Sequence, residues 1–529
     1  MREELRTHII AKTGLIYLVS NEEERVEDEF EILCNQLNYA LYTWDSNKGF
    51  NAIRLDKYNT KIQKEDAVLP GEGDDDPITQ IQKFKGDGVF ILKDFHYFLD
   101  ISKYGYAQKI IRSLKNLVRD LREQERNRII VMLSSIVRIP DELEHDISLV
   151  DFELPNQQIL SRCVTEFIAR NNFHKKTYLN DQSEFDKIIK ALQGLTTIQA
   201  ERAIAKVFIK HGKLQSNFVQ DIYYEKKQII SKNGILEYIE TSESLDNIGG
   251  LKVLKNWLKQ RELAFSEKAR KFGLPIPKGI LLVGVQGVGK SLTAKAVSAA
   301  WKLPLVRLDV GRVFGSLVGE SEERIRQAIK VAEAISPCIL WIDEIDKAFA
   351  GISGYQGDSG TSARVFGSLL TWMQEKEKPV FIVATANNVV RVEKRENKLN
   401  YTPILPPELL RKGRFDELFF LDLPSKDERN EIFRIITRKY GLGSNFDYDM
   451  LSDRSGGMVD QKNDLGFSGA EIEQMVIEAM YNAFYDGEKP VTTEYILKAM
   501  SESNPLYKSM YNQIEGLRRW GSDNARQAN

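Results

Sequence analysis

The sequence predicts an α/β fold built on a parallel sheet, and three observations carry this prediction. Short apolar runs typical of buried strands alternate with longer segments typical of helices. A glycine-rich stretch at residues 284–291 separates one such run from a helical segment. Two carboxylates directly follow another apolar run, at residues 343–344. Because the carboxyl ends of parallel strands meet at one edge of a sheet, both features are expected at the same edge.

The glycine-rich stretch has the pattern G-x-x-x-x-G-K-[ST] and reads GVQGVGKS. Residues 279–283 before it predict a buried strand, and residues 292–297 after it predict a helix. Glycines allow backbone N–H groups to surround phosphate oxygens, and the following helix points its positive end at the same anion. Lys290 would then reach the outer phosphates, and the Ser291 hydroxyl would bind Mg²⁺. The alternative is a chance glycine-rich turn, which the strand–loop–helix context disfavours.

The carboxylate pair follows a second predicted strand, residues 337–342. Asp343 would hold a water molecule on Mg²⁺, and Glu344 would orient and deprotonate the attacking water. Alone, two acids after a strand indicate a solvated turn. The phosphate-binding pattern upstream, at domain-sized spacing, favours the catalytic interpretation.

Two further segments carry polar groups suited to phosphate chemistry. The predicted strand at residues 379–385 leads into Asn387, whose amide could position the water nucleophile. Arg411 and Arg414 lie on a turn with two prolines, and two guanidinium groups there would suit charge stabilisation at a γ-phosphate. In isolation, a pair of surface salt bridges would be the simpler interpretation of these arginines.

In this order the motifs resemble those of the AAA+ ATPases, and within them the AAA subclass, over residues 241–500. The resemblance implies a parallel sheet with flanking helices, followed by a small helical lid. The matched motifs are the adenine-contacting segment (246–251), Walker A (284–291), Walker B (338–346), sensor 1 (Asn387), the paired arginine fingers (Arg411 and Arg414) and the start of the sensor-2 helix (466–472).

The resemblance also implies a role for each matched residue. Ser291 and Asp343 are the expected Mg²⁺ ligands. The expected catalytic residues are Glu344, Asn387, Arg411 and Arg414. The residues expected to contact ATP are Asp246, Ile248, Gly249, Gly284, Gln286, Gly287, Val288, Gly289, Lys290, Ser291, Leu292, Asp343, Gly469 and Ala470.

A narrower resemblance covers nearly the whole chain. Residues 225–230, 341–349 and 385–388 are similar to the divergent conserved-reading-frame ATPases of plastids and cyanobacteria, the Ycf class. This resemblance implies a bacterial cytoplasm, cyanobacterial or other, or the plastid stroma, and it names no substrate.

Several positions depart from the family pattern. Val285, Gln286 and Val288 replace residues that shape the loop but supply no phosphate-binding side chain, so nucleotide binding is expected to survive. Leu317 stands where translocating relatives place a pore aromatic; it is either a weaker grip or a packing residue at a helix start. The charged stretch 391–401 is expected to be a solvated loop, and the glycine-rich stretch 351–360 a mobile, pore-facing loop.

The N-terminal third is predicted to be a degenerate copy of the same module. Predicted strands follow one another in the same order as in residues 241–424, and residues 197–201 suggest a vestigial lid. Acidic residues 22–24 stand where a phosphate-binding loop would be, and Phe95 replaces the catalytic glutamate. We therefore expect this part to bind no nucleotide. The alternative is an unrelated α/β domain.

The expected organisation has five parts. They are a degenerate AAA-like module (1–215), a helical connector (216–240), a large ATPase subdomain (241–424), a helical lid (425–505) and a C-terminal tail (506–529) that is frayed from residue 515.

Composition excludes several classes of protein. The formal net charge of −2 over 529 residues argues against a nucleic-acid partner. Cys34, Cys163 and Cys338 are far apart and lack zinc-site spacing, which indicates small buried residues in a reducing compartment. Residues 1–6 carry acids, so no secretory signal is expected, and no apolar run reaches the length of a membrane span.

The leading functional hypothesis is an ATPase that converts ATP and water to ADP and phosphate in a ring, with six subunits as the family expectation. The ring would remodel an unknown protein or protein complex, with a link to photosynthetic regulation. The alternative is a nucleotide-gated scaffold or regulatory switch that threads no substrate. A DNA-remodelling ATPase is disfavoured by the balanced charge.

Overall fold

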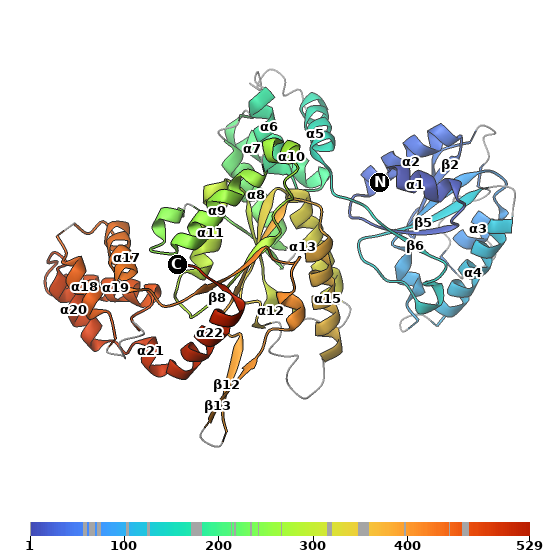
Figure 1. Cartoon of the computed structure of the whole chain (residues 1–529). Helices are drawn as coiled ribbons and strands as arrows, with labels where there is room; N and C mark the ends of the chain where they lie inside the picture. The colour runs from blue at the N-terminus through green and yellow to red at the C-terminus, as the bar shows by residue number, and fades with distance from the viewer. Residues whose placement is uncertain are drawn as a thin grey trace. The chain divides into compact units, whose positions relative to one another are not determined.

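The computed structural model divides the chain into two compact units, Met1–Val219 and Gln220–Asn529 (Figure 1). No helix among the described residues is long and apolar enough to cross a membrane. The structure describes the chain apart from residues 1, 57–60, 63–68, 71–75, 102–104, 124–126, 171–181, 213, 216–217, 233–234, 242, 266, 315–319, 348–358, 396–397, 444 and 458–464.

The first unit contains a sheet with the strand order β3-β2-β4-β5-β1-β6. All neighbours pair in parallel except β2 and β3, which form an antiparallel pair. The central strands are continuous apolar runs and are buried, as expected for a parallel sheet covered on both faces. The strands are β1 (Leu15–Val19), β2 (Ala40–Asp45), β3 (Gly49–Arg54), β4 (Gly88–Lys93), β5 (Arg128–Ser134) and β6 (Ser148–Asp151).

Helices cover both faces of this sheet, and each face has its own apolar core. Phe30 on α2 packs on one face with Ile91, whereas Leu114 on α4 packs on the other with Phe90. The helices of the first unit are α1 (Arg2–Ile10), α2 (Glu23–Leu37), α3 (Pro77–Lys83), α4 (Ala107–Glu123), α5 (Gln157–Arg170), α6 (Gln182–Leu192) and α7 (Thr197–His211).

The second unit repeats the same topology. Its sheet has the order β15-β14-β8-β11-β10-β9-β7, and its central strands pair in parallel. Without the edge strands β3, β7 and β15, each sheet has the sequential order second, third, fourth, first, fifth. The shared order confirms the prediction of an AAA-like N-terminal module. The strands are β7 (Leu236–Ile239), β8 (Gly279–Gly284), β9 (Leu305–Leu308), β10 (Cys338–Ile342), β11 (Val380–Ala386), β14 (Glu417–Leu421) and β15 (Arg526–Gln527).

Helices again lie on both faces, and a helical subdomain follows β14 (Figure 1). Residues 216–240, expected to be a helical connector, contain helix α8 and strand β7, which pairs antiparallel with β9. The helices around the sheet are α8 (Val219–Lys232), α9 (Lys252–Glu262), α10 (Glu267–Phe272), α11 (Lys290–Trp301), α12 (Val310–Phe314), α13 (Glu320–Ile335), α15 (Ser359–Glu375) and α16 (Pro407–Leu410). Those of the lid are α17 (Lys426–Lys439), α18 (Tyr448–Arg454), α19 (Gly469–Tyr485) and α20 (Thr493–Glu502).

The C-terminal tail is ordered, so the expectation that it is frayed is wrong. After α21 (Leu506–Ser509), helix α22 (Tyr511–Asn524) buries Trp520 in the core of the second unit. Strand β15 then joins the edge of the sheet, pairing in parallel with β14. The tail is held by burial of one face of α22 and by the backbone hydrogen bonds of β15. Its polar composition does not predict either contact.

The charged stretch 391–401 is exposed or half-exposed in its described residues, as expected, but it forms paired strands rather than a loop. It lies within an antiparallel hairpin of β12 (Val390–Arg395) and β13 (Lys398–Pro403) that projects beside α22 (Figure 1). The guanidinium of Arg519 lies 4.8 Å from the centre of the Tyr401 ring. A β-carbon at Gly516 would lie 2.8 Å from the same ring, so glycine permits the close approach of hairpin and helix.

Candidate nucleotide site

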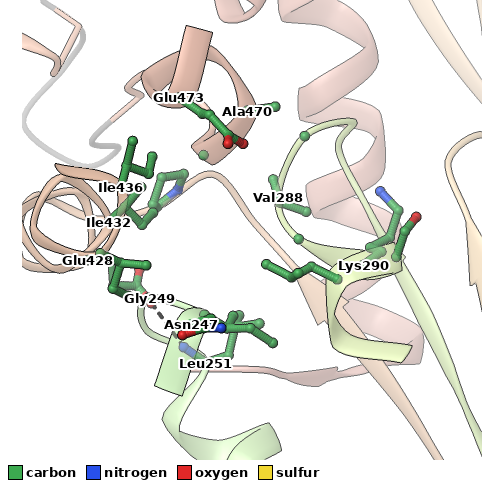
Figure 2. A pocket seen from close by; sticks show the side chains of 18 of the residues that line it. Asn247, Gly249, Leu251, Val288, Lys290, Glu428, Ile432, Ile436, Ala470 and Glu473 are labelled. Atoms are coloured by element: carbon green, nitrogen blue, oxygen red, sulfur yellow. Dashed lines mark hydrogen bonds between the residues drawn. The ribbon is translucent and has the colours of Figure 1, made fainter. Parts of the chain in front are cut away.

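A cavity of about 780 Å³ lies in the second unit at the carboxyl edge of the sheet. Its size is in the range of small-molecule sites. Figure 2 shows Val288 and Lys290 from the glycine-rich loop on one side and the lid residues Ile432 and Ile436 on the other. The pocket brings together most of the residues expected at a nucleotide: Asp246, Ile248, Gly249, Gln286, Gly287, Val288, Gly289, Lys290, Ser291, Leu292, Glu344, Asn387, Gly469 and Ala470.

The glycine-rich loop connects β8 to α11. Gly287 and Gly289 have φ values of +80° and +93°, a left-handed conformation that side chains disfavour. The Lys290 Nζ donates to the carbonyl oxygens of Gly284 at 2.7 Å and Val285 at 2.5 Å. Burial lowers the pKa of Lys290 to about 8, against the opposing effect of nearby carboxylates. The loop therefore holds a buried cation at the start of a helix, which suits an anionic ligand.

The carboxylates Asp343 and Glu344 follow β10, and Thr385 of β11 holds both. The Thr385 hydroxyl donates to Asp343 Oδ1 at 2.7 Å and accepts the Glu344 backbone N–H at 2.9 Å. Arg307 of β9 donates to Asp343 Oδ2 at 3.1 Å. Glu344 has a φ of +50°, so this backbone turn is fixed in an uncommon conformation.

Asn387 lies against the predicted catalytic glutamate. Its Nδ2 donates to Glu344 Oε1 at 3.0 Å, and Lys347 forms an ion pair with the same carboxylate. Asp346 accepts the backbone N–H groups of Asn387 and Asn388 at 3.2 and 3.0 Å. Burial raises the pKa of Asp346 despite these hydrogen bonds. The sheet thus positions the glutamate and the amide as one unit at the pocket.

The segment 246–251 is held from the lid side. A β-carbon at Gly249 would lie 2.6 Å from Ile432 Cγ1 on α17. The Gly250 N–H donates to Glu431 Oε2 at 2.9 Å. At the other end of the pocket, the Ala470 N–H donates to the Gly287 carbonyl at 3.0 Å, which joins the first turn of α19 to the glycine-rich loop. Lid, loop and segment 246–251 therefore form one enclosure.

Oxygen ligands suited to Mg²⁺ are present near the loop. Ser291 is the second residue of α11, after Lys290, and Asp343 directly follows β10. Hydroxyl and carboxylate oxygens fit a hard cation that is bound together with phosphates. Among the described residues, no group of three or more His, Cys, Asp or Glu side chains could hold a metal by itself. The residues present therefore fit Mg²⁺ carried in with a nucleotide.

Four expected site residues do not line the cavity: Gly284, Asp343, Arg411 and Arg414. Gly284 contacts the lining residue Lys290, and Asp343 is connected to the lining residue Glu344 through the Thr385 hydroxyl. Arg411 is exposed, and Arg414 donates to the Glu408 carbonyl within its own turn. Leu317 and most of the stretch 351–360 lie outside the described residues.

Sequence reasoning missed several residues that support the site. Thr385 was seen only as part of a strand, and Arg307, Asp346 and Lys347 were given no role. Asp346 is the last residue of the motif 338–346, so the sequence does single it out. Its hydrogen-bond partners, the N–H groups of Asn387 and Asn388, follow only from the register of β10 against β11. That register pairs Ile342 with Ala384, which brings Thr385 beside the carboxylates.

The first unit fills the corresponding place with its own side chains. Glu22 follows β1 and is 3% exposed; its Oε1 accepts the Thr197 N–H at 2.7 Å and the Thr197 hydroxyl at 3.1 Å. Its Oε2 lies 2.6 Å from Arg25 Nη2. The Glu22 carboxylate therefore occupies the N-terminus of α7, where a phosphate-binding loop would meet the lid. Phe95 is fully buried.

Glu22→Ala should loosen α7 in the full chain. The substitution leaves the half-buried Arg25 without the Glu22 carboxylate and leaves two hydrogen-bond donors of Thr197 without this acceptor, so local stability should fall by about 3 kcal/mol. Hydrogen exchange of the α7 amides measures this change. Glu24→Ala is the matched control, because Glu24 is an exposed acid two residues further on, in the first turn of α2. Equal protection of α7 in both variants would refute this role of Glu22.

Three segments of the chain match known families. Residues 1–152 match the N-terminal domain and residues 157–233 the second domain of SpoVK-like AAA ATPases. Residues 280–423 match the ATPase family associated with various cellular activities, AAA. The AAA domain-containing protein ycf46 of Trieres chinensis is 41% identical over 525 residues, which cover 98% of this chain and 96% of the relative.

The chain belongs to the AAA ATPases, in the family of the ycf46 proteins. The ycf46 protein of Gracilaria tenuistipitata var. liui is 39% identical over 528 residues, with 98% of this chain and 97% of the relative covered. The proteasome-activating nucleotidase of Sulfurisphaera tokodaii is 31% identical over 290 residues, 54% of this chain and 66% of that protein. Recognition of the family, the α/β fold with a second AAA-like module and the prediction of an ATPase are thereby confirmed.

Proposed function

We propose that the protein assembles as a ring in which ATP hydrolysis remodels a protein or protein complex. This proposal rests on one observation: only some of the expected catalytic residues line the pocket of their own chain. Glu344 and Asn387 line the pocket of their own chain, whereas Arg411 and Arg414 do not. A head-to-tail contact between copies would supply the arginines to a neighbour's nucleotide, and such contacts close into rings. A hexamer is the assembly that we propose.

Within one chain, each residue has a definite task. Lys290 and the loop N–H groups bind the phosphates, and Glu344 accepts a proton from the attacking water. Asn387 orients this carboxylate through the hydrogen bond to Oε1, and Thr385 fixes the backbone behind it. Mg²⁺, when bound at Ser291 and Asp343, supplies neutralisation of the phosphate charge.

A protein client is favoured over nucleic acid. The net charge of −2 provides no general attraction for a polyanion. One similar AAA protein is named a proteasome-activating nucleotidase, and this name specifies a protein complex as its target. We propose the plastid stroma or a bacterial cytoplasm as the compartment, and a client in photosynthetic regulation.

The second candidate is a nucleotide-gated scaffold without threading. It is favoured by the first unit, where the Glu22 carboxylate replaces a phosphate and fixes the lid helix independently of nucleotide. Such a unit would recruit a partner while the second unit cycles slowly.

A trap variant separates the two candidates. Glu344→Gln should retain ATP and hold a client, which affinity capture from an extract of the source cells would recover. ATP turnover by the parent protein should then rise when that client is added in an unfolded form. If the unfolded client leaves ATP turnover unchanged, while binding of the client to the protein depends on nucleotide, the protein is a nucleotide-gated scaffold. A Glu344→Gln protein that hydrolyses ATP at the parent rate contradicts both.

A further inference from the structure

The last residues of the chain reach the nucleotide pocket. After β15, the Ala528 N–H donates to the Phe420 carbonyl at 3.0 Å, which extends the pairing with β14. Ala528 is 1% exposed and packs with Leu254 and Phe419 in the apolar core under one face of the sheet. Asn529 follows it and lines the pocket. A segment expected to fray is therefore built into the wall of the site.

Two hydrogen bonds connect this segment to the start of α9. The Ala528 carbonyl accepts the Leu254 N–H at 3.1 Å, and Asn529 Oδ1 accepts the Leu251 N–H at 2.6 Å. Leu251 precedes the first helical residue of α9 and has a φ of +54°. The Leu251 side chain cannot cap the helix, so residues 528–529 supply the cap from another part of the chain: the Ala528 carbonyl accepts the N–H of the third helical residue, Leu254, and Asn529 Oδ1 accepts the N–H of Leu251 itself. The other acceptor for the Leu251 N–H, Glu428 Oε1, is more distant at 3.4 Å.

The cap lies at one end of the pocket, away from the expected phosphate position. Leu251, Ile248 and Gly249 line the end of the pocket formed with lid helix α17, whereas Lys290 and Ser291 line the phosphate end. Figure 2 shows Leu251 and Gly249 next to Glu428, and Lys290 at the opposite side. With phosphates at the loop, as the proposed function requires, a nucleoside would extend towards segment 246–251.

We propose that residues 526–529 form the wall at the base end of the nucleotide pocket, and that Asn529 is a positioning residue for base recognition. This inference rests on the proposed nucleotide site. Asn529 Oδ1 holds the left-handed turn at Leu251. This turn fixes the position of Ile248 and Gly249, which would contact the base. The attachment of the tail does not depend on this carboxamide, because Trp520 is buried and Arg518 pairs with Asp422 at 2.9 Å.

The test compares ATP with a ligand that has no base. Dissociation constants of ATP and of inorganic tripolyphosphate are measured by calorimetry on the full chain. Asn529→Ala should weaken ATP binding by up to about tenfold, because the shorter of the two hydrogen bonds to the Leu251 N–H is lost and the turn is held less firmly. Its tripolyphosphate affinity should stay at the parent value. In hydrolysis, KM should rise and kcat at saturating ATP should be retained.

Two variants sharpen the comparison. Asn529→Asp keeps an oxygen acceptor for the Leu251 N–H and should restore most of the ATP affinity. Asn524→Ala removes an exposed amide that donates to the Trp520 carbonyl within α22, and it should behave as the parent. Equal weakening of ATP and tripolyphosphate in Asn529→Ala, or no weakening of either, overturns the inference. A parent chain that binds neither ligand overturns the proposed site as well.

Discussion

Arg414→Ala should lower ATP turnover by about a thousandfold while the dissociation constant of ATP changes little. The guanidinium would meet negative charge that grows on the phosphoryl oxygens in the transition state, so its loss affects the rate more than ground-state binding. Steady-state turnover and calorimetry on the same preparation measure the two effects. Lys412→Ala, an exposed cation on the same turn, is the matched control and should turn over at the parent rate.

Mixed rings test whether Arg414 acts on a neighbour. Arg414→Ala and Glu344→Gln subunits are each expected to be inactive alone. In a mixed ring, some interfaces pair an intact Glu344 with an intact Arg414 from the adjacent subunit, so part of the activity should return. Assembled mixtures that recover no activity would contradict a shared site.

Lys290→Ala should abolish measurable ATP binding, which corresponds to a loss of about a hundredfold or more in affinity. Lys290 is the buried cation of the glycine-rich loop, where we propose that the phosphates bind, and its Nζ donates to the carbonyl oxygens of Gly284 and Val285. Binding of a fluorescent ATP analogue measures the effect. Lys295→Ala, on the same helix but away from the pocket lining, should bind normally. An unchanged affinity in Lys290→Ala would show that the loop is not the phosphate site.

Local motifs explain which parts of the site could be predicted from the sequence. The glycine-rich loop, the carboxylate pair and Asn387 each lie within or directly after an apolar run, so their place at one sheet edge follows from strand order. Thr385 and Asp346 could not be assigned, because their hydrogen bonds depend on the register of β10 against β11. That register is a property of the folded sheet.

The two wrong expectations have a common physical cause. The hairpin at β12 and β13 and the short strand β15 are held by backbone pairing and by contacts with α22, rather than by an apolar pattern of their own. Charged and polar side chains on an edge strand resemble those of a loop. The composition of these segments therefore indicated an irregular chain where the structure has paired, largely exposed strands.

The degenerate first unit was predicted from the order of its strands, and its internal contact was not. Acids at residues 22–24 indicated only that phosphate would be repelled. The partner of Glu22, Thr197, lies 175 positions further along the chain, and no local pattern links them. The structure shows that the Glu22 carboxylate is held by Thr197 and Arg25, whereas the expectation that this unit binds no nucleotide stays a prediction.

The number of nucleotides held by a Glu344→Gln chain tests the central claim most directly. The claim is that one site, in the second unit, binds ATP and that Glu344 begins its hydrolysis. Calorimetry with ATP and Mg²⁺, followed by identification of the bound nucleotide, should give one ATP per chain that remains unhydrolysed. Two nucleotides per chain, or bound ADP formed at the parent rate, would contradict the account.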